Sequence, residues 1–274
     1  MNVTPLLPEI PWLAHENARF IAQLRALSDA DWTKPTFCPG WNAAQLVGHM
    51  TGGAISYAER IRAALRGEVI ISLGAGTPAE FQAARDEITR KSIAMSPKER
   101  IDWIERSQDA LQEEIERLEP GDLDRDLWHR KGNTKMRTFP AQRLYEVALH
   151  GWDLENDPDA PLETESLGAL VEILETRVPL YFNRAAPGGN TGVFRFETSS
   201  PEAAWEISIA DGEASTLDGL SSSPDAVLSA SGSDMVLLCA GRADRAQKIA
   251  DDSLRVEGDS QKAAALMDVL FRPF

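Results

Sequence analysis

Apolar residues recur at helical spacing along roughly the first 160 residues of the chain. In residues 11–32, one face carries Leu13, Phe20, Leu24 and Leu27. The same period predicts helices at residues 40–67, 77–93, 96–120 and 138–155. Thr77 and Ser96 are expected to cap two of these helices, and Gly67 and Pro120 are expected to end two. This succession predicts an antiparallel helical bundle.

The pattern changes near residue 160. A helix is expected at about 163–183, after which apolar and polar residues alternate with period two in "GVFRFET" (192–198) and "AWEISIA" (204–210). Shorter strands are expected within 211–219 and 225–231, then a helix at 231–244, a strand at 254–259 and a helix at 260–271. Strands followed by helices indicate a small α+β domain. We therefore expect a helical bundle at 1–158 and an α+β domain at 159–274.

Composition narrows the classes of function. The net charge is −15, with 43 acidic and 28 basic residues, which disfavours nucleic-acid binding. The arginines of "RIRAALRG" (60–67) are expected on a solvated helix face. Apolar runs are too short to span a bilayer, and the N-terminus lacks the basic region of a signal peptide. Cys38 and Cys239 are far apart in sequence and form no disulfide framework, so a cytoplasmic location is expected.

Ionisable residues interrupt the apolar faces of two expected helices. In "RLYEVALHGWDL" (143–154), Glu146 and His150 are four residues apart and project from the same face as apolar neighbours. His49 lies within "AQLVGHMTGG", in the first half of the expected helix at 40–67, which carries no charged side chain. Burying such groups is costly unless their polar atoms find partners.

A metal site would provide partners for all three residues. In a helical bundle, two ligands at i and i+4 can meet a third from a facing helix, and a His₂Glu set leaves a coordination position open for chemistry. A simpler alternative pairs Glu146 with Arg143, its i−3 neighbour, and leaves both histidines hydrogen-bonded in the core. Spacing alone keeps both interpretations open.

Two motifs carry a resemblance to a known family. "DWTKPTFCPGWNAAQLVGHMTGG" has a Pro-Gly-Trp turn eight positions before His49, and residues 143–154 match the pattern Arg-Leu-x-Glu-x-x-x-His-x-x-Asp-Leu. Both resemble the mycothiol-dependent maleylpyruvate isomerase family, within the DinB-like metal-binding bundles. "LLCAGRAD…LRVEGDSQKAAALMDVL", with Gly241-Arg242 and Gly258-Asp259, is similar to that family's sterol-carrier-like second domain. The resemblance is weakest over residues 68–136.

The resemblance implies a reaction and its cofactors. It places a divalent metal, expected to be zinc, on His49, Glu146 and His150, and matches Arg242 to an arginine that reaches the site from the C-terminal domain, which completes the active-site cleft. A small thiol, mycothiol or otherwise glutathione, bacillithiol or ergothioneine, adds as thiolate to the cis double bond of maleylpyruvate. Rotation and elimination then give fumarylpyruvate. The substrate is thus a small anionic electrophile.

The remaining candidates keep two interpretations each. Arg85 is either a second anion clamp or a surface charge, and Asp153 either orients His150 or lies in solvent. Trp41 and Trp152 either pack or wall the pocket that binds the cofactor. Cys38 is either a protein nucleophile or a packing residue, and packing is expected, while His15 and His129 are expected to be structural or exposed. Thiol S-transfer and non-catalytic binding of a metal and a small ligand remain as alternative functions.

Overall fold

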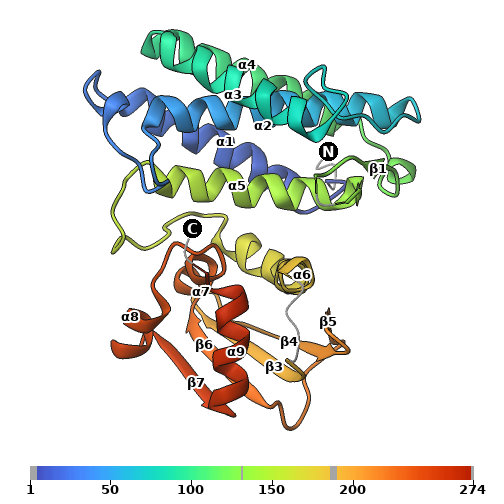
Figure 1. The fold of residues 1–274 in the computed structure, drawn as a ribbon, viewed down its shortest axis with the longest axis vertical. Helices are drawn as coiled ribbons and strands as arrows, with labels where there is room; N and C mark the ends of the chain where they lie inside the picture. The colour runs from blue at the N-terminus through green and yellow to red at the C-terminus, as the bar shows by residue number, and fades with distance from the viewer. Residues whose placement is uncertain (1–4, 131, 186–189, 273–274) are drawn as a thin grey trace. The chain divides into compact units, whose positions relative to one another are not determined.

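The computed structural model describes residues 5–130, 132–185 and 190–272 and divides the chain into two compact units, Met1–Asp157 and Pro158–Phe274. A helical bundle forms the first unit and a mixed five-stranded sheet with helices forms the second (Figure 1). The expected fold class is confirmed. No helix among the described residues is long and apolar enough to cross a bilayer.

Five long helices make up the first unit. They are α1 (Glu9–Ala26), α2 (Ala43–Leu65), α3 (Pro78–Ala94), α4 (Pro97–Glu116) and α5 (Phe139–Asp153). Short 3₁₀ turns occur at Asp31–Thr33, Pro120–Asp122 and Met136–Thr138. Helix α2 packs on α3 and α4, while α1 packs on α5. The small antiparallel pair β1 (Asp126–Leu127) and β2 (Thr134–Lys135) was not expected, because two-residue strands carry no periodic signal.

Three helix ends lie where the sequence places their capping residues, whereas α4 ends at Glu116, before the expected Pro120. The side chains of Thr77 and Ser96 each accept a hydrogen bond from a backbone N–H in the first turn. The glutamate three residues later accepts a hydrogen bond from the backbone N–H of the capping residue. Gly67 has a φ of +83°, and its N–H donates to the Ala64 carbonyl, which closes α2. The first helix is shorter than expected, ending at Ala26. The reason is that the Asp31 carboxylate accepts from the backbone and hydroxyl of Ser28, which favours a separate turn.

Arg60 corrects one expectation about α2. It is only 6% exposed, whereas the sequence placed it on a solvated face. Its guanidinium donates to the Ser72 hydroxyl at 3.1 Å, to the Trp128 carbonyl at 3.0 Å and to the Ser56 hydroxyl. Fixed partners and aromatic rings replace water around this charge. Arg60 therefore anchors two loops to α2.

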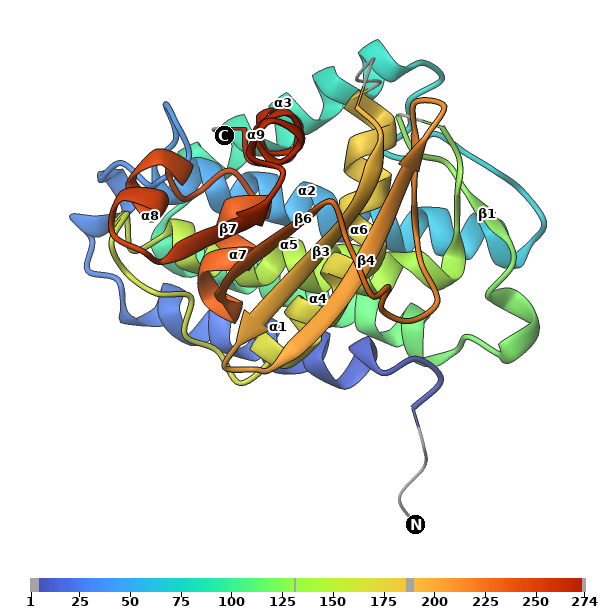
Figure 2. The ribbon, with the colours of Figure 1, turned by 90° about the horizontal axis from the view of Figure 1, so that it is seen from below.

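The second unit is built on one sheet with the strand order β5-β4-β3-β6-β7. Its elements are α6 (Leu167–Ala185), β3 (Gly192–Ser199), β4 (Ala203–Ala210), β5 (Glu213–Thr216), β6 (Ala226–Ser231), α7 (Gly232–Cys239), α8 (Arg245–Ala250), β7 (Leu254–Gly258) and α9 (Ser260–Leu270). Strands β3 and β6 pair in parallel and the other neighbours are antiparallel. In Figure 2 the strands cross the front of the second unit, with α6 and α7 behind them. Helix α8 was not expected.

Candidate metal site

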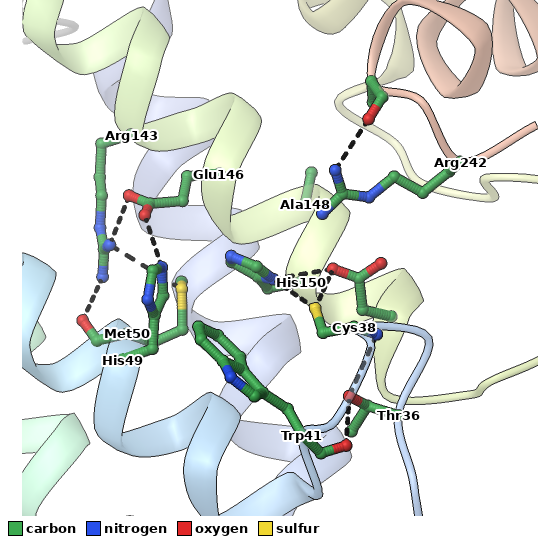
Figure 3. Close-up of polar contacts among 12 residues, drawn as sticks. Thr36, Cys38, Trp41, His49, Met50, Arg143, Glu146, Ala148, His150 and Arg242 are labelled. Atoms are coloured by element: carbon green, nitrogen blue, oxygen red, sulfur yellow. Dashed lines mark hydrogen bonds and ion pairs between the residues drawn. The ribbon is translucent and has the colours of Figure 1, made fainter. Parts of the chain in front are cut away.

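The three residues expected as metal ligands meet within the first unit. His49 comes from α2, and Glu146 and His150 come from α5 (Figure 3). One ligand atom of each lies within 4.8 Å of the others. His49 Nε2 is 3.2 Å from Glu146 Oε1, and the ring centroids of His49 and His150 are 5.1 Å apart. Residues separated by 97 positions in sequence thus form one cluster that could hold a metal ion.

Arg143 fixes the orientation of Glu146. Its side chain is completely buried, with Nη1 donating to Glu146 Oε2 at 2.9 Å and Nη2 donating to the Met50 carbonyl at 3.0 Å. Because Arg143 occupies Oε2, the other carboxylate oxygen is left for His49. The ion pair considered as an alternative to a metal site is therefore present together with the cluster.

The protonation states of these groups suit a metal ion. Burial lowers the pKa of His49 to about 4, so its imidazole is neutral at pH 7 and carries a lone pair. Burial alone would raise the pKa of Glu146, but the Arg143 charge and the hydrogen bond with His49 hold it well below its usual range. Neutral imidazoles and a carboxylate form a typical zinc donor set. The side chains of His49 and Glu146 are 20% and 27% exposed, so solvent reaches the cluster.

Two further predicted residues lie against His49. Arg85 Nη2, on α3, is 2.9 Å from His49 Nδ1 and 3.3 Å from Nε2. The Trp41 ring is 4.8 Å from the His49 ring and forms a wall beside it. Trp152 is instead 3% exposed, with its ring 4.8 Å from that of Phe37. Arg85 therefore places a cation beside the cluster.

A second group shares His150 with the first. Asp153 Oδ2 is 2.8 Å from His150 Nδ1, and Cys38 Sγ is 3.2 Å from the same oxygen. Asp153 is fully buried, so its interpretation as a solvated helix end is wrong. Cys38, His150 and Asp153 also form a buried triad that could hold a metal. The sequence did not predict the contact of Cys38 with Asp153, because 115 positions separate the two residues.

The other candidates lie outside both groups. Arg242 belongs to the second unit, where its Nη1 donates to the Ala240 carbonyl at 2.8 Å, and its role in the site stays a prediction. The His15 ring contacts Trp12 edge-on, with the ring centroids 6.1 Å apart. The carbonyl of His129 accepts from the backbone of Gly132. Neither histidine joins a metal-capable group in the described part of the chain.

Gly53 provides the space that Arg143 occupies. A Cβ at Gly53 would lie 2.8 Å from Arg143 Nη1, whereas a Cβ at Gly52 would meet Ile88 at an ordinary 3.5 Å. Alanine stabilises a helix interior by about 1 kcal/mol relative to glycine. We expect Gly52→Ala to gain this stability. Gly53→Ala should instead lose about 1–3 kcal/mol, because overpacking displaces Arg143 from Glu146.

Urea unfolding of both variants in the presence of chelator checks this prediction. Metal content, measured in parallel, should fall only in Gly53→Ala. If the two variants gain equal stability and retain equal metal content, Arg143 is not held as described.

Sequence and structure comparisons agree with this organisation. The family model "Mycothiol maleylpyruvate isomerase N-terminal domain" matches residues 13–155, and the "SCP-2 sterol transfer family" model matches residues 185–271. No curated protein sequence matches the chain. The fold and the matches thus define a two-domain protein, in which a helical bundle with a possible metal site is followed by a sterol-carrier-like domain. The chain belongs to the mycothiol-dependent maleylpyruvate isomerase family.

Solved structures match this chain over different shares of its length. The crystal structure of the mycothiol-dependent maleylpyruvate isomerase matches with a TM-score of 0.65 and 16% identity, over 93% of each chain. A histidine-to-alanine mutant of the isomerase matches with the same values. A sterol carrier protein 2-like protein from Aedes aegypti matches 38% of this chain and 95% of its own, with 22% identity and a TM-score of 0.30.

Proposed function

We propose that this protein is a metal- and thiol-dependent cis–trans isomerase of maleylpyruvate-type substrates. The observation that carries the proposal is the cluster of His49, Glu146 and His150, whose ligand atoms lie within 4.8 Å of one another. Three protein ligands leave a coordination position open, as catalytic zinc sites do. The partial exposure of His49 and Glu146 gives a small molecule access to that position.

The three side chains would hold a divalent metal, for which zinc suits the donor set best. When bound, the metal would favour the thiolate form of a small thiol at neutral pH. Arg143 keeps Glu146 ionised and oriented, and the low pKa of His49 keeps that imidazole neutral. Glu146 and His49 are therefore held in the protonation states that metal binding requires.

The reaction follows from addition and elimination. A thiolate sulfur forms a bond to one carbon of the cis double bond, and the electron pair moves to the conjugated carbonyl oxygen as an enolate. The remaining single bond rotates, and the electron pair returns as the C–S bond breaks, which releases the thiolate and the trans isomer. Arg85, whose Nη2 is 2.9 Å from His49 Nδ1, would neutralise the substrate carboxylate or the enolate. The scheme needs no nucleophile from the protein.

The experiment is a maleylpyruvate assay with mycothiol, glutathione, bacillithiol and ergothioneine in turn, with and without chelator. We expect turnover only when both metal and one of the thiols are present. Arg85→Met should raise KM at least about 10-fold by removing a charge-assisted contact, whereas Arg90→Met, exposed on the same helix, should not. Turnover without any thiol, or with metal removed, would contradict the proposal.

The same assay separates the alternatives. Thiol adducts with a model electrophile, without isomerisation, would assign the protein to S-transfer. Binding of acyl ligands without either reaction would assign it to non-catalytic binding. We place the reaction in the cytoplasm, where a small thiol stays reduced.

A further inference from the structure

The His150 ring makes polar contacts that the proposed reaction does not use. Its Nδ1 atom is 2.8 Å from Asp153 Oδ2. The same atom is 3.8 Å from Cys38 Sγ, and Figure 3 shows His150 beside Cys38. Cys38 Sγ is itself 3.2 Å from Asp153 Oδ2. Cys38, His150 and Asp153 are 2%, 6% and 0% exposed. In such a buried setting, each polar hydrogen needs an acceptor.

The positions of the protons follow from the chemistry of these groups. A carboxylate only accepts hydrogen bonds, so with Asp153 ionised, His150 donates its Nδ1–H and Cys38 donates its S–H to the same Asp153 oxygen. A neutral imidazole with its proton on Nδ1 has its lone pair on Nε2. This is the nitrogen left to bind a metal together with His49 and Glu146.

The turn before α2 brings Cys38 to this position. Gly40 has a φ of +76°, which lets the chain reverse, and the Thr36 N–H donates to the Trp41 carbonyl at 2.8 Å. The Phe37 N–H donates to the Asp153 carbonyl at 2.9 Å. Both the backbone and the side chain of Asp153 therefore bind this turn, which links the beginning of α2 to the end of α5.

We propose that Asp153 and Cys38 are positioning residues for the metal ligand His150. Asp153 fixes the ring tautomer and orientation, and the Cys38 thiol holds the Asp153 oxygen in place. Partners of this kind raise the basicity of a ligating histidine and commonly change metal affinity 10–100-fold. The inference rests on the proposed metal site of His49, Glu146 and His150. It adds two residues that contact neither the metal nor the substrate.

The same three residues have a competing use as a second metal site. The 2.8 Å separation of His150 Nδ1 and Asp153 Oδ2 is a hydrogen-bond distance, which favours the positioning role. A second site would bind an additional ion and would give it a cysteine sulfur ligand. Stoichiometry and spectroscopy can therefore distinguish the two uses.

The test measures zinc affinity by competition with a chromogenic chelator in the full chain, together with the visible spectrum of the Co²⁺-loaded protein. We expect Asp153→Asn to keep one ion per chain, to bind it about 10–100-fold more weakly and to change the Co²⁺ spectrum. Cys38→Ala should weaken binding severalfold, whereas Cys38→Ser, which keeps a hydrogen-bond donor, should remain within about threefold of the natural protein. Cys239→Ala is the control, and it should leave both the zinc affinity and the Co²⁺ spectrum unchanged.

Each outcome bears on one claim. Unchanged affinity and spectrum in Asp153→Asn, or equal affinities in Cys38→Ala and Cys38→Ser, would overturn the positioning role. Two ions per chain, with the second lost in Cys38→Ala, would overturn it in favour of a second metal site. If Asp153→Asn does not fold, the two Cys38 variants still decide. Failure of His49→Ala to lose metal would instead refute the site on which the inference rests.

Discussion

Replacing His49 with alanine is expected to remove the bound metal and, with it, the thiol-dependent activity. His49 is the one ligand that α2 contributes, and its loss leaves Glu146 and His150 on α5 as a two-residue set. Substitution of a residue that contacts a metal ligand already lowers metal affinity 10–100-fold. Removal of a ligand itself should therefore lower metal affinity more than about 100-fold. Metal analysis after dialysis and the maleylpyruvate assay measure the two effects.

His15→Ala is the matched control for this variant. His15 lies on α1 against Trp12 and belongs to neither metal-capable group. We expect it to retain both metal and activity. Equal metal content in His49→Ala and the natural protein would exclude the proposed ligand set.

Among the variants considered for stability, Arg143→Met is expected to lower the free energy of unfolding most. Methionine fills much of the buried volume but removes the donors to Glu146 and to the Met50 carbonyl. Removing one partner of a buried ion pair typically costs 3–5 kcal/mol. Because the Glu146 side chain is 27% exposed, we expect about 3 kcal/mol in the free energy of unfolding. Urea unfolding in the presence of chelator measures this loss without a contribution from metal.

Two comparisons identify the cause of this loss. Arg25→Met breaks an ion pair with Glu105 whose side chains are 58% and 36% exposed, and should cost less than about 1 kcal/mol. The double variant Arg143→Met/Glu146→Gln should recover part of the loss, since no carboxylate is then left unpaired. If Arg143→Met and Arg25→Met are equally mild, the Arg143–Glu146 pair does not stabilise the bundle.

Local sequence signals predicted the helical frame well. Thr77 and Ser96 act as caps because their hydroxyls and the glutamates three residues later satisfy backbone groups within one turn. Glu146 and His150 could be placed together because a helix fixes the positions of residues four apart. His49 required the family motif as well, since nothing local specifies which helix faces α5.

Features that depend on contacts between residues far apart in sequence could not be predicted from local patterns. In the sequence Arg60 has the pattern of a surface residue, because its partners Ser72 and Trp128 lie in loops that are distant along the chain. Cys38 gains its contact with Asp153 only through the turn that precedes α2. In each case one member of the contact comes from a loop, where neither periodicity nor capping specifies position. The role of Arg242 stays a prediction.

X-ray absorption at the zinc edge, on the metal-loaded full chain without added thiol, tests the central claim most directly. The ligand set of His49, Glu146 and His150 predicts one zinc ion per chain, bound only by nitrogen and oxygen at about 2.0–2.2 Å, with two imidazoles. A sulfur atom at about 2.3 Å would place the metal on Cys38 and contradict the account, as would a chain that binds no metal.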